Sequence, residues 1–361
     1  MTGPQEAPLS GVKVIDLSAL TPGPFATLML AELGATVVKV ERAGAGDPLR
    51  AMLPKTFEML NRGKLSLELD LKDPDDRELL LGLCEGADVF IEGFRPGVVE
   101  RLGVGFAEVS RRRPGITYLS LSSYGQTGPL AHAPGHDLNF VARSGGLWLG
   151  DPSAYGVYQV ADLAAAAYAV IAVLASLQAR TPGAGHIDLS LLGSAMAFTQ
   201  LAAGEAAETH AAPSTGQRPA NGVFVAGDGE RLTVCAVEDQ FWQALCAVLD
   251  LGDMARRPEL AAYADRIRHA DEINVAVAAA LAGKTCSEWL AALDEAGVPA
   301  APVLSPAGAR SDPQVAHLGL AADPEPAVSL PAVGLALASL GASPLLGEHN
   351  DVVREHGWEG K

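Results

Sequence analysis

The first 125 residues alternate between short apolar runs and amphipathic stretches. β-Branched and apolar runs at 12–18, 36–42, 65–71, 88–94 and 116–125 predict five strands. Between them, 25–33 has a helical pattern with Pro24 near its first turn. A second helix is predicted over 73–87, with Asp73 or Asp75 as its cap and Pro74 near its first position. The β-α-β order predicts a parallel sheet with right-handed crossovers, and therefore a doubly wound α/β unit.

The pattern changes after an apolar helix predicted over 161–178. Residues 221–237 form two short strand patterns around a Gly-Asp-Gly turn, which predicts a hairpin. Helical patterns follow at 239–249, 271–282 and 286–297, and a last one at 346–357. The chain is therefore predicted to have a large domain over 1–204 and a smaller α+β domain over 205–305. The segment 306–361 is expected to return to the large domain.

Composition narrows the function classes. A chain of 361 residues with 48% hydrophobic and 19% charged residues is typical of a soluble globular protein. Its net charge of −17 argues against a nucleic-acid partner, which requires a basic surface. The longest apolar run, at 163–177, is short and alanine-rich, so a buried helix is expected and not a membrane span.

The cysteines and the N-terminal segment bear on the cellular compartment. Four scattered cysteines, with no CxxC spacing and no Cys/His cluster, indicate buried thiols in a reducing compartment and no metal site. The first residues have neither the basic region nor the apolar core of a signal peptide. We therefore expect a cytoplasmic protein.

Several cations follow the ends of predicted strands. Open α/β sheets bind ligands beyond the carboxyl ends of their strands, and cations there can pair with phosphates. Each could instead be an ordinary solvated charge, but as a group in an acidic chain they favour a phosphate-rich ligand. The turn after the first strand, "SALTPGPFA", lacks the G-x-G-x-x-G pattern, which argues against NAD or FAD. The cations are Arg42, Arg50, Arg62, Lys64, Lys72 and Arg95.

Two positions are candidates for acid/base chemistry. His136 and Asp137 follow Gly135 in a loop rich in glycine and proline, and Asp137 is predicted to cap the helix that follows. Asp162 lies at the start of the apolar helix and is the only charge between Asp151 and Arg180. It is either a helix-terminal acid favoured by the helix dipole or a partly desolvated carboxylate with a raised pKa. The start of that helix could also offer backbone N–H groups to an oxyanion.

Several motifs, in the same order along essentially the whole chain, resemble those of the family III coenzyme A transferases (the CaiB/BaiF family). They are "LSALTPGPFATLMLAELGATVVKVER", "NRGKLSLELDLK", "DVFIEGFRPGVVERLGVG", "YLSLSSYGQTGPLAHAPGHDLNF" and "LGEHN". The family includes the α-methylacyl-CoA racemases. The resemblance implies a Rossmann-like large domain, a small domain, and two chains interlocked as a homodimer.

The resemblance also implies roles for individual residues. Transferases of the family use an aspartate as nucleophile, whereas the racemases use a histidine and an aspartate as two bases. Asp162 matches the aspartate, His136 in Gly-His-Asp matches the racemase histidine, and Glu238 matches a glutamate near that histidine. Contacts to the coenzyme A moiety are implied for Arg42, Leu69, Asp70, Leu71, Lys72, Arg95, Gly135, Asp137, Leu138, Asn139 and Phe140.

This chain departs from the racemases around Asp162. They have an asparagine four residues earlier, where this chain has Tyr158, and glycines after it, where this chain has Leu163 and alanines. The first hypothesis is epimerisation of 2-methylacyl-CoA thioesters by His136 and Asp162, with Glu238 supporting His136. The alternatives are a CoA-transferase with Asp162 as nucleophile, and a protein that binds CoA thioesters without turnover. All three take an acyl-CoA partner and no separate cofactor.

Overall fold

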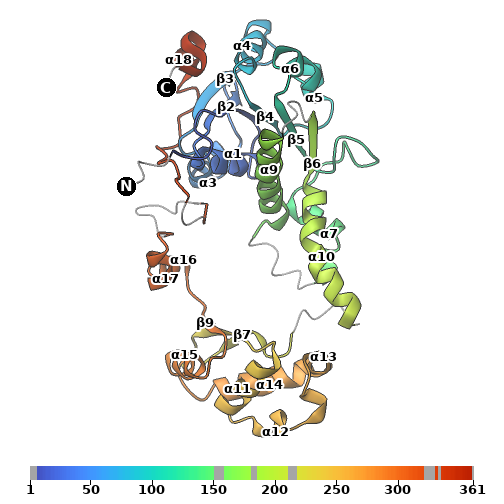
Figure 1. The fold of residues 1–361 in the computed structure, drawn as a ribbon, viewed down its shortest axis with the longest axis vertical. Helices are drawn as coiled ribbons and strands as arrows, with labels where there is room; N and C mark the ends of the chain where they lie inside the picture. Colours follow the sequence, from blue (N-terminus) through green and yellow to red (C-terminus); the bar gives the residue numbers. More distant parts are fainter. Residues whose placement is uncertain are drawn as a thin grey trace. The chain divides into compact units, whose positions relative to one another are not determined.

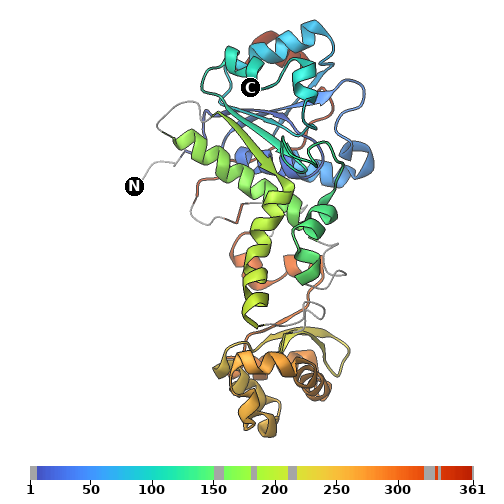
Figure 2. The same cartoon turned by 90° about the vertical axis from the view of Figure 1, so that its right-hand side faces the viewer.

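The computed structural model describes residues 6–149, 158–179, 185–209, 218–320, 330–331 and 335–359. The chain divides into two compact units. Unit 1 comprises Met1–Leu147, Pro152–Gln200 and Leu318–Lys361, and unit 2 comprises Trp148–Asp151 and Leu201–His317. The C-terminal segment thus belongs to unit 1 from Leu318 onward. Figures 1 and 2 show the elements of each unit.

Unit 1 contains a six-stranded sheet in the order β3-β2-β1-β4-β5-β6. Every neighbouring pair of strands is parallel. This order is that of a doubly wound Rossmann-like sheet, and it confirms the fold class predicted from the sequence. The strands are β1 (Lys13–Leu17), β2 (Thr36–Arg42), β3 (Leu65–Leu69), β4 (Val89–Glu92), β5 (Thr117–Ser122) and β6 (His186–Ser190).

Successive strand residues point to opposite faces of this sheet, and both faces are apolar. Helices therefore cover both faces. Val14 lies in the core with the helices α1 (Pro22–Glu32) and α9 (Val160–Gln178), whereas Ile15 lies in the core with α4 (Pro74–Cys84). Figure 1 shows α4 and α1 on opposite sides of the sheet. The other helices with their start in unit 1 are α2 (Leu49–Met52), α3 (Pro54–Leu60), α5 (Val98–Leu102), α6 (Phe106–Arg112), α7 (Asp137–Arg143), α8 (Gly146–Leu149), α10 (Leu191–Thr209), α18 (Asn350–His356) and the 3₁₀ helix at Gly357–Glu359.

Helix α9 carries the alanine-rich run of the sequence. By length and composition it could cross a membrane. However, its alanines at 161, 165, 166 and 169 are buried in the core that also contains α1 and β5, and Ala164 is buried as well. Small side chains on this face let the helix approach its neighbours closely. These contacts are those of a core helix in a globular unit.

Unit 2 has a three-stranded antiparallel sheet in the order β7-β8-β9. The predicted hairpin is confirmed, because β7 (Asn221–Val225) pairs with β8 (Arg231–Cys235), while β9 (Ala300–Pro302) was not predicted. Trp242, Leu245 and Trp289 pack in its core. The helices are α11 (Asp239–Val248), α12 (Gly252–Ala255), α13 (Tyr263–Arg266), α14 (Ala270–Leu281), α15 (Cys286–Glu295), α16 (Pro306–Arg310) and α17 (Pro313–His317), with 3₁₀ turns at Pro258–Leu260 and Ile267–His269.

Several elements differ from the sequence prediction. Strand β6, of sequence HIDLS, was missed because it is short, polar and only partly buried at the sheet edge. Helix α18 begins at Asn350, later than the predicted start at 346, because the residues before it form a turn against β3. Among the predicted caps, Asp73 does cap α4: its side chain accepts the N–H of Asp75 at 2.8 Å. All four cysteines are free, and three of them are buried.

Candidate active site

A cavity lies where the carboxyl ends of β1, β4 and β5 meet. Strands β1 and β4 are neighbours although β2 and β3 separate them in the chain, so the strand order reverses direction between them. Doubly wound sheets bind ligands at this point. The cavity has a volume of about 150 Å³. Its lining comes from the end of β5, from the segments after the three strands, from residues 131–140, and from the helices α9 and α10. The lining residues are Ser18, Ala19, Leu20, Pro22, Gly23, Gly93, Phe94, Arg95, Pro96, Leu121, Ser122, Ser123, Ala131, Ala133, Gly135, His136, Phe140, Asp162 and Leu191.

His136 and Asp162 both line this cavity, and Asp137 links the two segments that carry them. One carboxylate oxygen of Asp137 accepts the N–H of Ala161 at 2.7 Å and that of Asp162 at 3.1 Å. Gln159, the residue before α9, has a left-handed backbone and makes no side-chain cap. The first turn of α9 is therefore capped by a side chain of α7, and Asp137 precedes Asp162 by 25 residues in the chain.

Two sequence predictions are corrected by this contact. Asp137 was predicted to cap its own helix, but it is the first residue of α7, so its side chain is free to reach α9. The start of α9 was also expected to be able to offer backbone N–H groups to an oxyanion, and Ala161 and Asp162 carry two of the N–H groups there. Both are bound to Asp137 instead.

Asp162 has the electrostatics of a group that exchanges protons near neutral pH. Burial raises the pKa of its carboxyl group to about 7, and the nearby Asp137 carboxylate adds to the rise. Both effects disfavour the charged form, in the direction expected from the sequence. At pH 7 the protonated and ionised forms of Asp162 therefore coexist.

The loop before α7 is held in one conformation. A Cβ atom on Gly135 would lie 2.6 Å from the Phe140 ring and 2.9 Å from the Tyr124 hydroxyl, so only glycine fits. The N–H of His136 donates to Asn139 Oδ1 at 3.0 Å, and the N–H of Asn139 donates to the carbonyl of His136 at 2.8 Å. The backbone of His136 is thus fixed while its side chain is exposed at the cavity.

The residues predicted to contact coenzyme A fall at two places along one edge of the sheet. Arg42 ends β2 and lies in register with Leu69 of β3, beside Asp70, Leu71 and Lys72. The side chain of Leu69 is buried in the core, so a contact of this residue with coenzyme A would have to come from its backbone. The second place is the cavity, which includes Arg95, Gly135 and Phe140, whereas Leu138 and Asn139 are exposed on α7.

Three of the predicted phosphate-binding cations have other partners. Arg50 makes two hydrogen bonds to the Glu41 carboxylate, at 2.8 and 2.7 Å. Arg62 pairs with Glu32 at 3.3 Å. Lys64 is 2% exposed and lies 3.3 Å from Asp16. The cations left exposed at the strand ends are Arg42, Lys72 and Arg95.

Glu238 belongs to unit 2, where it directly precedes α11 and is exposed. The buried Arg266 donates to the carbonyl of Val237 at 2.8 Å and pairs with the side chain of Asp239 at 2.8 Å, so it contacts the residues on both sides of Glu238. Its predicted support of His136 stays a prediction. Within the residues that the structure describes, no group of three or more His, Cys, Asp and Glu side chains could hold a metal ion.

The sequence analysis missed the segment after β1, which supplies five residues of the cavity lining. It also missed the buried charges at Asp16, Lys39 and Glu92. In each case the charged residue interrupts an apolar strand pattern, and this interruption could have indicated a buried charge. Burial raises the pKa of Glu92 to about 7, and its carboxylate accepts the N–H of Phe94 at 2.8 Å.

Comparisons with known proteins identify the family. Acetyl-CoA:oxalate CoA-transferase of Acetobacter aceti is 36% identical over 86% of this chain and 84% of its own length. Human alpha-methylacyl-CoA racemase is 33% identical over 82% of this chain and 78% of its own length. The crystal structure of a CAIB/BAIF family protein from Brucella suis has a TM-score of 0.84 and 27% identity, and covers 99% of this chain and 100% of that one. The family model "CoA-transferase family III" matches residues 9–350, and the chain therefore belongs to that family.

Proposed function

We propose that this protein epimerises 2-methylacyl-CoA thioesters by 1,1-proton transfer, with His136 and Asp162 as the acid/base pair. The observation that carries the proposal is that both side chains line one cavity at the carboxyl ends of the central strands. The human racemase relative and the Gly135-His136-Asp137 motif support it further. Coenzyme A enters as part of the thioester, so the reaction needs no separate cofactor.

The proposed reaction requires two proton-transferring groups on opposite faces of the α-carbon. One base removes the α-proton, the C–H electron pair forms the enolate double bond, and the thioester carbonyl oxygen becomes negative. The other group then donates a proton to the opposite face, which restores the carbonyl and inverts the centre. A pKa of about 7 lets Asp162 serve as the base in one direction and as the acid in the other.

A second candidate is transfer of CoA between carboxylic acids. The transferase of Acetobacter aceti is more similar to this chain than the human racemase is, at 36% against 33% identity. In that reaction, the Asp162 carboxylate attacks the thioester carbonyl, the C–S bond breaks and releases the CoA thiolate, and an acyl anhydride forms on Asp162. The acyl group finally leaves as the free acid, and the CoA thiolate becomes the thioester of the acceptor acid. This chemistry has no evident role for His136, which is why we place it second.

The phosphates of the substrate are proposed to lie on Arg42, Lys72 and Arg95. Removing one charged contact should weaken phosphate binding by roughly tenfold, given the ordinary strength of a hydrogen bond to a charged group. Arg42→Ala and Arg95→Ala are therefore expected to raise KM for any acyl-CoA, with a smaller effect on kcat. Arg111→Ala, which removes an exposed cation on α6, is the control. Steady-state kinetics at two salt concentrations measure this, and unchanged KM in both variants would rule the contacts out.

We also propose the interlocked homodimer that the family resemblance implies. Large apolar side chains are exposed on α9 and α10, including Ile171 at 58% and Phe198 at 53%. The interface of an obligate dimer buries more than roughly 2,000 Å² of total accessible surface and is more apolar than the rest of the surface. Sedimentation at micromolar concentration is expected to give a dimer. A stable and active monomer would refute it.

The experiment that tests the proposed function is proton exchange in D₂O. Purified protein with a 2-methylacyl-CoA and no acceptor acid is expected to place deuterium at the α-carbon. A transferase instead requires an acceptor acid and forms an acyl-enzyme that hydroxylamine traps.

A further inference from the structure

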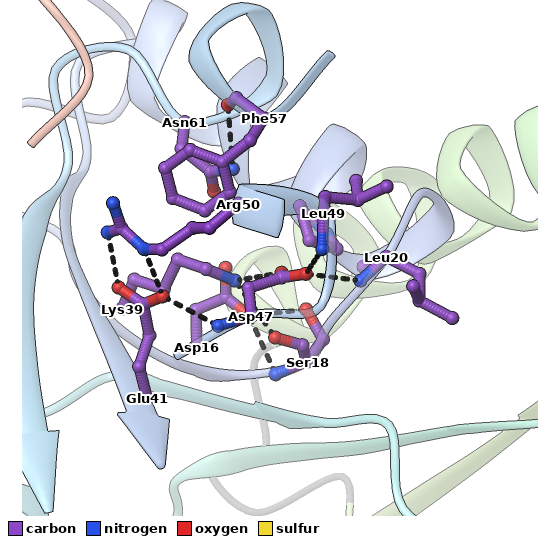
Figure 3. Close-up of polar contacts among 12 residues, drawn as sticks. Asp16, Ser18, Leu20, Lys39, Glu41, Asp47, Leu49, Arg50, Phe57 and Asn61 are labelled. Carbon is purple, nitrogen blue, oxygen red and sulfur yellow. Dashed lines mark hydrogen bonds and ion pairs between the residues drawn. The ribbon is translucent and has the colours of Figure 1, made fainter. Parts of the chain in front are cut away.

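Three charged side chains are enclosed in unit 1 beside the cavity, and we refer to Asp16, Lys39 and Asp47 as the charge clamp. Asp16 and Lys39 are register neighbours on β1 and β2, and Asp47 lies in the loop after β2. Asp16 and Lys39 are 0% exposed, and Asp47 is 3% exposed. Figure 3 shows the three side chains close to Ser18 and Leu20.

The charge clamp binds the backbone of two residues in the cavity wall, Ser18 and Leu20. Asp16 Oδ1 accepts the N–H of Ser18 at 2.9 Å, and Lys39 Nζ donates to the carbonyl of Ser18 at 3.0 Å. Asp47 Oδ1 accepts the N–H of Leu20 at 3.3 Å. The backbone is therefore held on both sides of Ala19, by groups from three different parts of the chain.

The segment is held in a conformation that needs such support. Leu20 has a φ of 65°, in the left-handed region that leucine rarely adopts. Strained residues of this kind persist where the surroundings fix them. Packing is equally tight, because a Cβ atom on Gly23 would lie 2.1 Å from Ser18 Oγ.

Asp47 is itself held by contacts with Glu41 and Lys39. Its N–H donates to Glu41 Oε2 at 3.0 Å, and Glu41 is bound by Arg50 through two hydrogen bonds. Asp47 Oδ2 is buried and makes no regular hydrogen bond within the part of the chain that the structure describes. The ammonium group of Lys39, 3.0 Å away, neutralises it. The position and charge of Asp47 thus depend on Glu41 and Lys39 together.

Stability alone explains this cluster poorly. Burial of charges opposes folding, and an apolar replacement of a buried ion pair is often equally stable. Lys64, next to the charge clamp, illustrates this cost of burying a charge. Burial lowers its pKa to about 7, although the Asp16 carboxylate lies 3.3 Å away. What the cluster does hold is Ser18, Ala19 and Leu20, which line the same cavity as His136 and Asp162.

We propose that Lys39 and Asp47 are positioning residues: they fix Ser18–Leu20 as the wall against which the acyl thioester is held for reaction. The proposal rests on the proposed function in so far as the cavity is the active site, and it applies to epimerisation and to transfer alike. A displacement of about 1 Å in a positioned group can reduce a rate by about 10²-fold. Loosening the wall is therefore expected to lower kcat more than it raises KM.

The test is the double variant Lys39→Met/Asp47→Ala, which removes both charges together and leaves neither one unpaired. Its kcat is expected to fall by about 10–100-fold in whichever reaction the wild type catalyses, with KM changed by less than about threefold. Hydrogen exchange at the Leu20 amide, followed by mass spectrometry, is expected to become at least about tenfold faster. Asp47→Asn keeps the Oδ1 acceptor and should retain the protection of Leu20 and most of kcat.

The matched control is Arg62→Met/Glu32→Gln, which removes another ion pair with a nearly buried carboxylate, outside the cavity lining. It is expected to keep wild-type kcat. Unchanged Leu20 exchange in the Lys39/Asp47 double variant would overturn the proposal, and so would faster exchange with wild-type kcat. If the double variant does not fold, Asp47→Asn and Asp47→Ala are compared, and equal Leu20 exchange in the two overturns it. Hydrogen exchange at the Leu20 amide needs no catalytic turnover. It therefore tests the charge clamp even if the wild type catalyses neither reaction.

Discussion

Asp162→Asn is expected to reduce the rate of epimerisation by about 10²–10⁴, the usual contribution of a positioned acid or base. The amide has nearly the same shape as the carboxyl group but neither removes nor donates a proton at the α-carbon. His136 remains, so solvent exchange of the α-proton should survive for one of the two enantiomers. The measurement is the rate of inversion and of deuterium uptake with (R)- and (S)-2-methylacyl-CoA. Complete loss of both, for both enantiomers, would point to a nucleophilic role.

The thermal stability of Asp162→Asn tests the raised pKa of Asp162 independently of catalysis. The pKa of Asp162 is about 7 in the folded state, against an ordinary value of 3.8, so the folded state binds the proton more tightly than the unfolded state. The wild type therefore loses stability as the pH rises from about 4 to about 7, and the loss is complete above pH 7. Asp162→Asn removes this effect. Its Tm is therefore expected to exceed that of the wild type at pH 8, and the difference should shrink as the pH falls toward 4. Thermal unfolding at both pH values checks this, and a lower Tm at pH 8 would contradict the assigned pKa.

His136→Asn is expected to lower inversion by a similar factor, about 10²–10⁴. Asp162 remains as the only base, so deuterium uptake should survive for the enantiomer opposite to the one that Asp162→Asn still processes. The transferase hypothesis predicts near-normal turnover for this variant, since the nucleophile is intact. His132→Asn, which changes an exposed histidine in the same loop outside the cavity lining, is the control.

The sheet was predictable because its strands are buried on both faces. Val14 and Ile15, or Val37 and Val38, are apolar neighbours that face different cores, so the strand pattern is a continuous apolar run. Strand β6 has no such run, since it lies at the edge with only partly buried residues. Local pattern alone could not distinguish it from a loop.

Two residues of the candidate cavity, His136 and Asp162, were predictable from the sequence, whereas their surroundings were not. His136 and Asp162 stand out by residue type and position in the sequence. The cap of α9 by Asp137 joins residues 24 positions apart, and no local motif encodes such a contact. For the same reason Arg50 and Lys64 were taken for ligand-binding cations, although Glu41 and Asp16 pair with them in the folded chain.

The central claim is that the α-proton leaves and returns, and one measurement tests it most directly. The wild-type protein is incubated in D₂O with each enantiomer of a 2-methylacyl-CoA, without any acceptor acid, and the α-position is followed by NMR and mass spectrometry. The account predicts that one deuterium enters the α-carbon and that both enantiomers converge on the same mixture. Absence of α-deuterium, together with acyl transfer to an added carboxylic acid and an intermediate trapped by hydroxylamine, would contradict it in favour of the transferase. Absence of both reactions would leave a protein that binds CoA thioesters without turnover.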